Sequence, residues 1–132
     1  PELHRDIVRF SKFRSPMNHV SLMFKKSAVL NAGGYKKMMW LEDYYLIIRL
    51  IHAGAICSNI QESLVNVRAG AGQLERRRGL SYAMSEFRLL VIMRRLGAIT
   101  WFQFLVNASL KFSVRLLPRT IFGVIFSLIR RF

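Results

Sequence analysis

The sequence predicts an α/β fold with few short strands, followed by amphipathic helices. Apolar and polar residues alternate across residues 18–24, as they do in a strand with one buried face. Two more short runs, residues 55–59 and 63–68, have the composition of strands. Residues 41–54 form an apolar run of helical length between them, so strands and helices alternate along the first half of the chain.

The first 17 residues are polar and basic, and Pro16 disfavours a helix at Ser15, so a loop is predicted there. The strand at 18–24 leads into one or two helical turns, with Ser27 as the N-cap and Gly33-Gly34 as the stop.

Residues 36–40 are predicted to form a loop, and residues 41–54 a helix with Gly54 as its C-cap. Its residues are apolar around most of the helix circumference. We therefore expect this helix to be buried on most sides.

The second half of the chain is predicted to be mostly helical. Residues 74–97 predict one long helix, bent at Gly79 and ended by Gly97, and Pro118 ends a second helix over residues 98–117. In this second helix the polar residues recur every fourth position and so share one face. They are Gln103, Asn107, Lys111 and Arg115.

Charge divides the chain into unequal parts. The 132 residues carry a net charge of +14, yet 52% of them are hydrophobic. Residues 68–132 hold twelve Lys and Arg against two acids, and the change comes at the glycine-rich residues 68–72. We expect three regions: residues 1–72, a basic amphipathic helix at 73–97, and apolar, basic C-terminal helices at 98–132.

A basic but apolar chain is typical of a protein that lies against an anionic membrane surface. The uncharged stretches at 96–110 and 120–129 have 15 and 10 residues, short of the roughly 20 that a span requires. We therefore predict helices in the plane of the membrane interface. The alternative is that they pack on another part of the protein or on another subunit.

The segment from "NHVSLMFKKS" through "GGY" to "LEDYYLIIRLIHAG" resembles the second half of the catalytic domain of family 2 glycosyltransferases of the GT-A fold. The resemblance covers residues 14 to 95 well and the tail more loosely. "RRRGLSYAMSEFRLL" is similar to members that build bacterial surface polysaccharides. The resemblance as a whole implies that the chain is the acceptor-side, C-terminal part of a GT-A domain.

The chain departs from that family in one respect. The family's amino-terminal half carries the nucleotide-binding portion and an Asp-x-Asp metal motif, whereas the two aspartates here are Asp6 and Asp43. The resemblance implies Mg²⁺ or Mn²⁺ in the complete enzyme, with the metal motif outside this chain. The first residue is Pro1, which favours a fragment or a processed piece. The resemblance implies that this piece lacks its N-terminal half and is inactive by itself.

Two acids, Glu42 and Asp43, precede the apolar helix. By spacing alone they are helix-capping acids, since the helix dipole favours negative charge there. The resemblance implies instead that Asp43 is the general base, deprotonating the acceptor hydroxyl. For Glu42, it implies a role in positioning the acceptor, and the alternative is an ion pair with a nearby cation.

The other acceptor-side candidates have structural alternatives. Asn18 and His19 precede the predicted strand and are either site residues or ordinary polar residues. Gly33 and Gly34 either let the acceptor approach the backbone or end a helix. Trp40 either stacks on a sugar or anchors the core.

The strongest basic cluster comprises Arg68, Arg76, Arg77 and Arg78. Guanidinium groups bind phosphates in a bidentate manner, so these residues are candidates for a donor diphosphate, a lipid pyrophosphate or anionic headgroups. The alternative is a solvated helix face. Cys57, with no paired base in the sequence, is expected to be a buried small residue.

Taken with the resemblance, the sequence predicts an inverting glycosyltransferase of the hexosyltransferase type. It would move a sugar from a nucleotide sugar to a glycan or lipid-linked acceptor at the cytoplasmic face of a bacterial inner membrane, without binding nucleic acid. The alternative is a non-enzymatic, basic amphipathic module that binds membrane or nucleic acid, and steep salt dependence would identify the latter.

Overall fold

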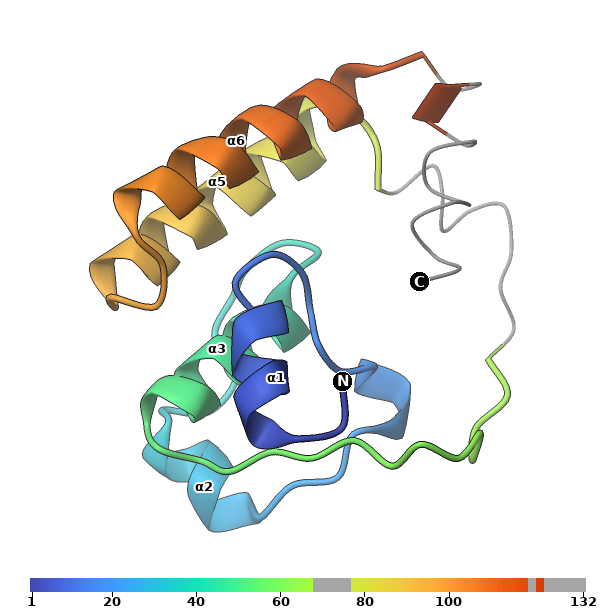
Figure 1. The fold of residues 1–132 in the computed structure, drawn as a ribbon, viewed down its shortest axis with the longest axis vertical. Helices are drawn as coiled ribbons and strands as arrows, with labels where there is room; N and C mark the ends of the chain where they lie inside the picture. The colour runs from blue at the N-terminus through green and yellow to red at the C-terminus, as the bar shows by residue number, and fades with distance from the viewer. Residues whose placement is uncertain (68–76, 119–120, 123–132) are drawn as a thin grey trace.

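The computed structural model describes residues 1–67, 77–118 and 121–122. Over these ranges the regular elements are α1 (His4–Phe10), the 3₁₀ turn η1 (His19–Ser21), α2 (Lys26–Asn31), α3 (Glu42–His52), α5 (Gly79–Arg95) and α6 (Trp101–Leu116). Helices α5 and α6 lie side by side as a hairpin, with α1, α2 and α3 grouped beside it (Figure 1).

The predicted α/β fold is wrong for this chain, because the described residues contain no strand. A strand requires a neighbour that shares its backbone hydrogen bonds, and the extended segments here have none. Instead, η1 interrupts residues 18–24, and Leu22 N donates to His19 O within that turn (3.2 Å). In residues 55–67, the other predicted strand region, the amide of Asn59 donates to Glu2 O (3.2 Å), in a segment that forms no strand. Arg68 lies outside the described residues.

The prediction of a loop over residues 1–17 is also wrong, because α1 occupies part of it. A single side chain, Ile7, is fully buried from this helix. One buried residue leaves no apolar periodicity in the sequence, so tertiary burial and not pattern selects the helix. The hydroxyl of Tyr44 on α3 donates to Ser11 O, which joins the end of α1 to α3.

Helix α2 forms where a helical turn was predicted, and the glycine pair ends it as expected. Gly33 and Gly34 have φ of 80° and 64°, a conformation that glycine adopts at little cost, and their amides bond Leu30 O and Val29 O. The predicted N-cap is wrong: Lys25 occupies that position, and Ser27 lies inside the helix.

Helix α3 is the centre of the packing and is buried on most sides, which confirms the prediction. Its residues Tyr44 and Ile48 join a core with Met93 and other residues of α5, while Leu46 and Leu50 pack with Val29 of α2. Gly54, with φ of 84°, follows the C-cap Ala53 and gives the left-handed turn that ends the helix.

Helix α5 begins at Gly79 (φ 83°) instead of bending there, because Arg78 before it is extended. Gly97 ends the helix as predicted, and residues 74–76 lie outside the described part. The buried face consists of Tyr82, Ala83, Ser85, Glu86, Leu89, Leu90 and Met93.

Helix α6 confirms the second predicted helix with slightly shorter bounds. Thr100 and Gln103 form a capping box: Gln103 N donates to Thr100 Oγ1 (3.2 Å) and Thr100 N donates to Gln103 Oε1 (3.0 Å). Leu117 is extended before Pro118, as proline requires of the residue that precedes it. None of the helices in the described ranges has both the length and the hydropathy to cross a bilayer.

The buried hydroxyl of Tyr44 predicts a pH effect. Burial, and secondarily the Glu86 carboxylate, raises the pKa of Tyr44 well above its ordinary 10.0. The folded state therefore keeps a proton that the unfolded chain releases, so this contribution is complete below about pH 10 and is lost as pH rises further. Urea unfolding should show the wild type losing stability above about pH 10 more steeply than Tyr44→Phe. If the unfolding free energies of the two proteins fell equally with pH, this prediction would be contradicted.

Candidate functional site

The candidate site begins at the first turn of α3. Asp43 is half-buried, Glu42 is exposed, and Asp43 Oδ1 accepts a hydrogen bond from Tyr44 N (2.7 Å). The carboxylate of Asp43 therefore interacts with the positive end of the helix, as the capping alternative requires. Its partial exposure also leaves it accessible to a substrate, so the geometry is compatible with both roles.

Arg49 braces the loop that leads to Asp43, and the sequence patterns had assigned it no role. It is buried in α3, and its guanidinium donates to Ala32 O and to Gly34 O (2.6 Å) while stacking on the Tyr45 ring at 4.5 Å. The signal was present, since a lone Arg in an apolar helix needs buried acceptors. The glycine pair thus ends α2 and is held by Arg49.

Trp40 lies just before α3 with an unusual backbone. It is the one non-glycine residue with positive φ (69°) in the described part of the chain, a conformation that costs about 1–3 kcal/mol for a bulky residue. Its side chain is 44% exposed. The alternative that Trp40 anchors the core is therefore wrong, and the ring is available to a ligand.

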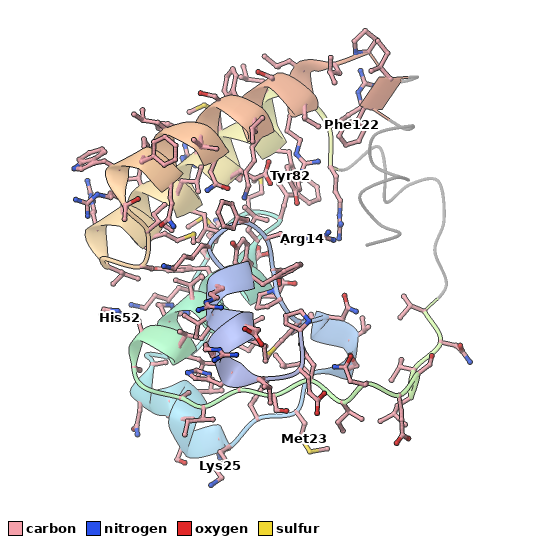
Figure 2. All side chains as sticks on the ribbon, viewed as in Figure 1. Arg14, Met23, Lys25, His52, Tyr82 and Phe122 are labelled. Carbon is pink, nitrogen blue, oxygen red and sulfur yellow. The ribbon has the colours of Figure 1, made fainter. Side chains whose placement is uncertain are left out.

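The start of α3 meets the start of α5 at Tyr82. Figure 2 shows Tyr82 on the side of α5 that faces α1 and α3. Burial raises the pKa of Tyr82, the Glu86 and Asp43 carboxylates raise it further, and Arg115 and Arg77 oppose them. Asp43 and Arg77 are therefore close enough to act electrostatically on one side chain, although 34 positions separate them in the sequence.

The arginine cluster is described in part. Arg77 is exposed, and Arg78 is the N-cap residue of α5. Arg68 and Arg76 lie outside the described residues. Of the predicted phosphate-binding arginines, Arg77 thus acts on the same side chain, Tyr82, as the predicted base Asp43.

The remaining acceptor-side candidates lie elsewhere. The exposed His19 makes an edge contact with the Tyr35 ring (5.9 Å between centroids), which places η1 beside the loop that follows Gly34. Asn18 lines a different feature, the hollow described next. The structure therefore does not gather all the predicted acceptor residues around Asp43.

A hollow of about 1070 Å³ opens between residues 16–25 and 54–65, over the end of α3. Its borders carry exposed apolar side chains, including Met23, Ile56 and Ile60. Met23 projects away from the body of the molecule (Figure 2). Neither Asp43 nor Trp40 lines this hollow, so it is distinct from the region around Tyr82.

Within the described ranges no three His, Cys, Asp or Glu side chains gather closely enough to hold a metal ion. These residues do not fit a metal centre. Cys57 is half-buried, burial raises the pKa of its thiol, and its amide bonds His4 Nδ1 (3.2 Å). The expected burial of Cys57 is therefore only partial, and its contacts are those of a structural residue.

Comparison with known proteins finds relatives along nearly the whole chain. An uncharacterised glycosyltransferase of Haemophilus influenzae is 39% identical over 121 residues, 92% of this chain and 45% of the relative. The Escherichia coli UDP-Gal:alpha-D-GlcNAc-diphosphoundecaprenol beta-1,3-galactosyltransferase is 37% identical over 96% of this chain and 46% of the relative. The Erwinia amylovora amylovoran biosynthesis glycosyltransferase AmsE is 32% identical over 90% and 43%.

No family model and no solved structure matches the chain. The chain spans slightly under half the length of these curated relatives. Its homologues are glycosyltransferases of bacterial polysaccharide biosynthesis.

Proposed function

We propose that the full-length protein is an inverting hexosyltransferase, similar to family 2 glycosyltransferases. It transfers a sugar from a nucleotide sugar to a glycan or lipid-linked acceptor at the cytoplasmic face of a bacterial membrane. The similarity to glycosyltransferases over at least nine-tenths of the chain carries this proposal. A relative named for a diphosphoundecaprenol acceptor supports the lipid-linked alternative.

In the proposed reaction Asp43 is the general base. Its carboxylate accepts the proton of the acceptor hydroxyl as that oxygen forms a bond to the anomeric carbon of the donor sugar. The bond from that carbon to the diphosphate oxygen breaks, and the nucleoside diphosphate leaves with the electron pair. Attack opposite the leaving group inverts the anomeric configuration.

Arg77 supports the departure of the diphosphate. Arg77 and Asp43 both act electrostatically on Tyr82, and we propose on this basis that they belong to one site. A guanidinium stabilises negative charge that develops on a leaving phosphate. We propose the same role for Arg78, and for Arg68 and Arg76 outside the described residues. Glu42, Trp40, His19 and the backbone at Gly33-Gly34 are proposed to contact the acceptor.

The remaining half of the protein is proposed to supply the nucleotide site and any Mg²⁺ or Mn²⁺ ligands, since the described residues form no metal cluster. We place this half against the hollow beside α3, because Met23, Ile56 and Ile60 on its border are 95%, 87% and 71% exposed. Apolar side chains gathered at one concave surface are typical of an interface. Asn18 would then lie in that interface.

The test is transfer by the full-length protein. Purified enzyme is incubated with labelled nucleotide sugars, singly, and with a polyprenyl-diphosphate sugar or an extracted lipid-linked glycan. The expected result is donor-dependent label in the lipid fraction, with the new linkage of opposite anomeric configuration to the donor. Retained configuration would overturn the inverting mechanism. Absence of transfer from every donor would contradict the function.

Trp40 provides a prediction about acceptor binding. In Trp40→Gly the ring is lost but the left-handed backbone conformation is relieved, so the protein should be at least as stable as the wild type. If the ring stacks on the acceptor sugar, the acceptor KM should rise about tenfold, equivalent to about 1.4 kcal/mol. Trp40→Phe, which keeps an aromatic face, should retain most of the affinity. An unchanged acceptor KM in Trp40→Gly would refute this role.

A further inference from the structure

Helix α6 packs with its polar face inward. Asn107 is 3% exposed and donates to Lys12 O (3.4 Å) and Gln103 O (2.8 Å). Lys111 and Arg115 contact the buried Glu86 of α5, at 3.8 Å and 2.8 Å. The polar stripe that the sequence displays is therefore the side on which α6 packs against the protein.

The opposite side of α6 is apolar and faces outward. Its large side chains are between 37% and 76% exposed. At 100° per residue they fall within about a third of the helix circumference, opposite Asn107. These residues are Trp101, Phe102, Leu105, Phe112 and Leu116.

Helix α5 extends this apolar surface. Its exposed Leu80, Met84 and Phe87 follow helical spacing on the side opposite its core residues. The Phe87 ring contacts that of Phe104 (5.7 Å), and Phe104 contacts Trp101 (5.7 Å), so the two helices are joined by aromatic side chains. We call the exposed apolar residues of α5 and α6 the outer face of the hairpin.

The charges near the outer face are positive. Between residues 77 and 118 the one acid is Glu86, which is buried and bound by Arg115. Arg88 and Arg95 are exposed on α5, and the Arg94 guanidinium lies 4.8 Å from the centre of the Trp101 ring. A Trp beside Arg, with Phe and Leu next to it, is the composition of a surface at the boundary between headgroups and acyl chains.

We propose that the outer face of the hairpin lies in the headgroup layer of an anionic bilayer, with α5 and α6 parallel to the membrane plane. The orientation follows from packing, because the inward sides of both helices are occupied along their length. It reverses the expectation for α6, whose Lys111 and Arg115 bind Glu86 and not lipid. A protein partner would also be expected to contact the apolar side chains of this surface, but the positive charge of Arg88, Arg94 and Arg95 favours anionic headgroups.

The test uses the full-length protein and vesicles of phosphatidylcholine, alone or mixed with phosphatidylglycerol. The double variant Phe102→Ser/Leu105→Ser should partition into mixed vesicles at least about tenfold less than the wild type, since two inserted side chains are lost. The matched control Leu3→Ser/Leu30→Ser removes two exposed apolar side chains that lie outside both the outer face and the hollow, and it should bind as the wild type does. Arg88→Gln/Arg95→Gln should lose the preference for the anionic vesicles.

The depth of Trp101 in the bilayer distinguishes insertion of the outer face from its burial against a protein. In a full-length variant in which every tryptophan except Trp101 is replaced by Phe, the fluorescence of Trp101 should shift to the blue and be quenched by lipids brominated along the acyl chain. Failure of the wild type to bind either vesicle, or equal loss in the control, would overturn the proposal. The proposal would also be overturned if the wild type were a dimer and Phe102→Ser/Leu105→Ser a monomer, because a second copy of the protein would then cover the outer face. Transfer to a soluble acceptor analogue tests the enzyme independently of this outcome.

Discussion

Asp43→Asn in the full-length protein is expected to lower turnover by about 10²- to 10⁴-fold, the usual contribution of a general base. Nucleotide-sugar binding should be nearly unchanged, because Asp43 is proposed to act on the acceptor. The measurements are kcat in a transfer assay and the donor Kd by calorimetry.

The structure lets Asp43→Asn distinguish a general base from a residue that only caps α3. Asp43 Oδ1 accepts a hydrogen bond from Tyr44 N, and an asparagine oxygen can accept it equally well. Asp43→Asn should therefore keep the melting temperature of the wild type while losing turnover. If Asp43 only caps α3, the result is reversed: Asp43→Asn stays active, and Asp43→Ala loses stability. Glu42→Gln is the comparison at the neighbouring carboxylate: it should raise the acceptor KM but keep most of kcat, because Glu42 is proposed to contact the acceptor and not to accept its proton.

Glu86→Gln is expected to cost about 3–5 kcal/mol of unfolding free energy, the usual effect of removing one partner from a buried ion pair. Glu86 is 7% exposed and accepts two hydrogen bonds from Arg115, at 2.8 Å and 3.0 Å, with Lys111 Nζ 3.8 Å away. Burial already lowers the pKa of Lys111, against the opposing effect of Glu86. Without the carboxylate, two poorly solvated cations lie side by side.

Urea unfolding measures this loss, and a compensated variant tests its cause. Glu86→Leu/Lys111→Met/Arg115→Met replaces the whole group with apolar side chains and should recover most of the stability, since buried ion groups are often replaceable in this way. Arg88→Gln, on the exposed side of α5, should change stability by no more than about 0.5 kcal/mol. A change as small as this in Glu86→Gln would show that the carboxylate does not hold α6 in place.

The helices that could be predicted are those whose signals are local. Gly33-Gly34, Gly54 and Gly97 end helices where expected, because left-handed backbone conformation is a property of the residue itself. The break at Pro118 is local in the same way, because proline itself restricts the residue that precedes it. The strands could not be judged from pattern, because pairing depends on a neighbour that the described residues do not supply. Helix α1 was missed because one buried residue, Ile7, leaves no periodicity.

The candidate site divides in the same manner. The acids before α3 and the arginines before α5 were visible as residue types, but their proximity through Tyr82 was not. The brace from Arg49 to Ala32 and Gly34 also links residues that only packing brings together. His19 and Asn18 were assigned to the same site, and the structure places Asn18 in the hollow instead.

The residue pattern alone is enough to place the ends of helices α3, α5 and α6, to divide α6 into one polar and one apolar side, and to show that the chain is strongly basic. Which side of α6 faces the protein depends on its packing against the other helices. Helical periodicity defines two faces but not their environments, and a buried carboxylate on another helix can draw basic side chains inward. Glu86 does so here, and the apolar side of α6 is left facing outward.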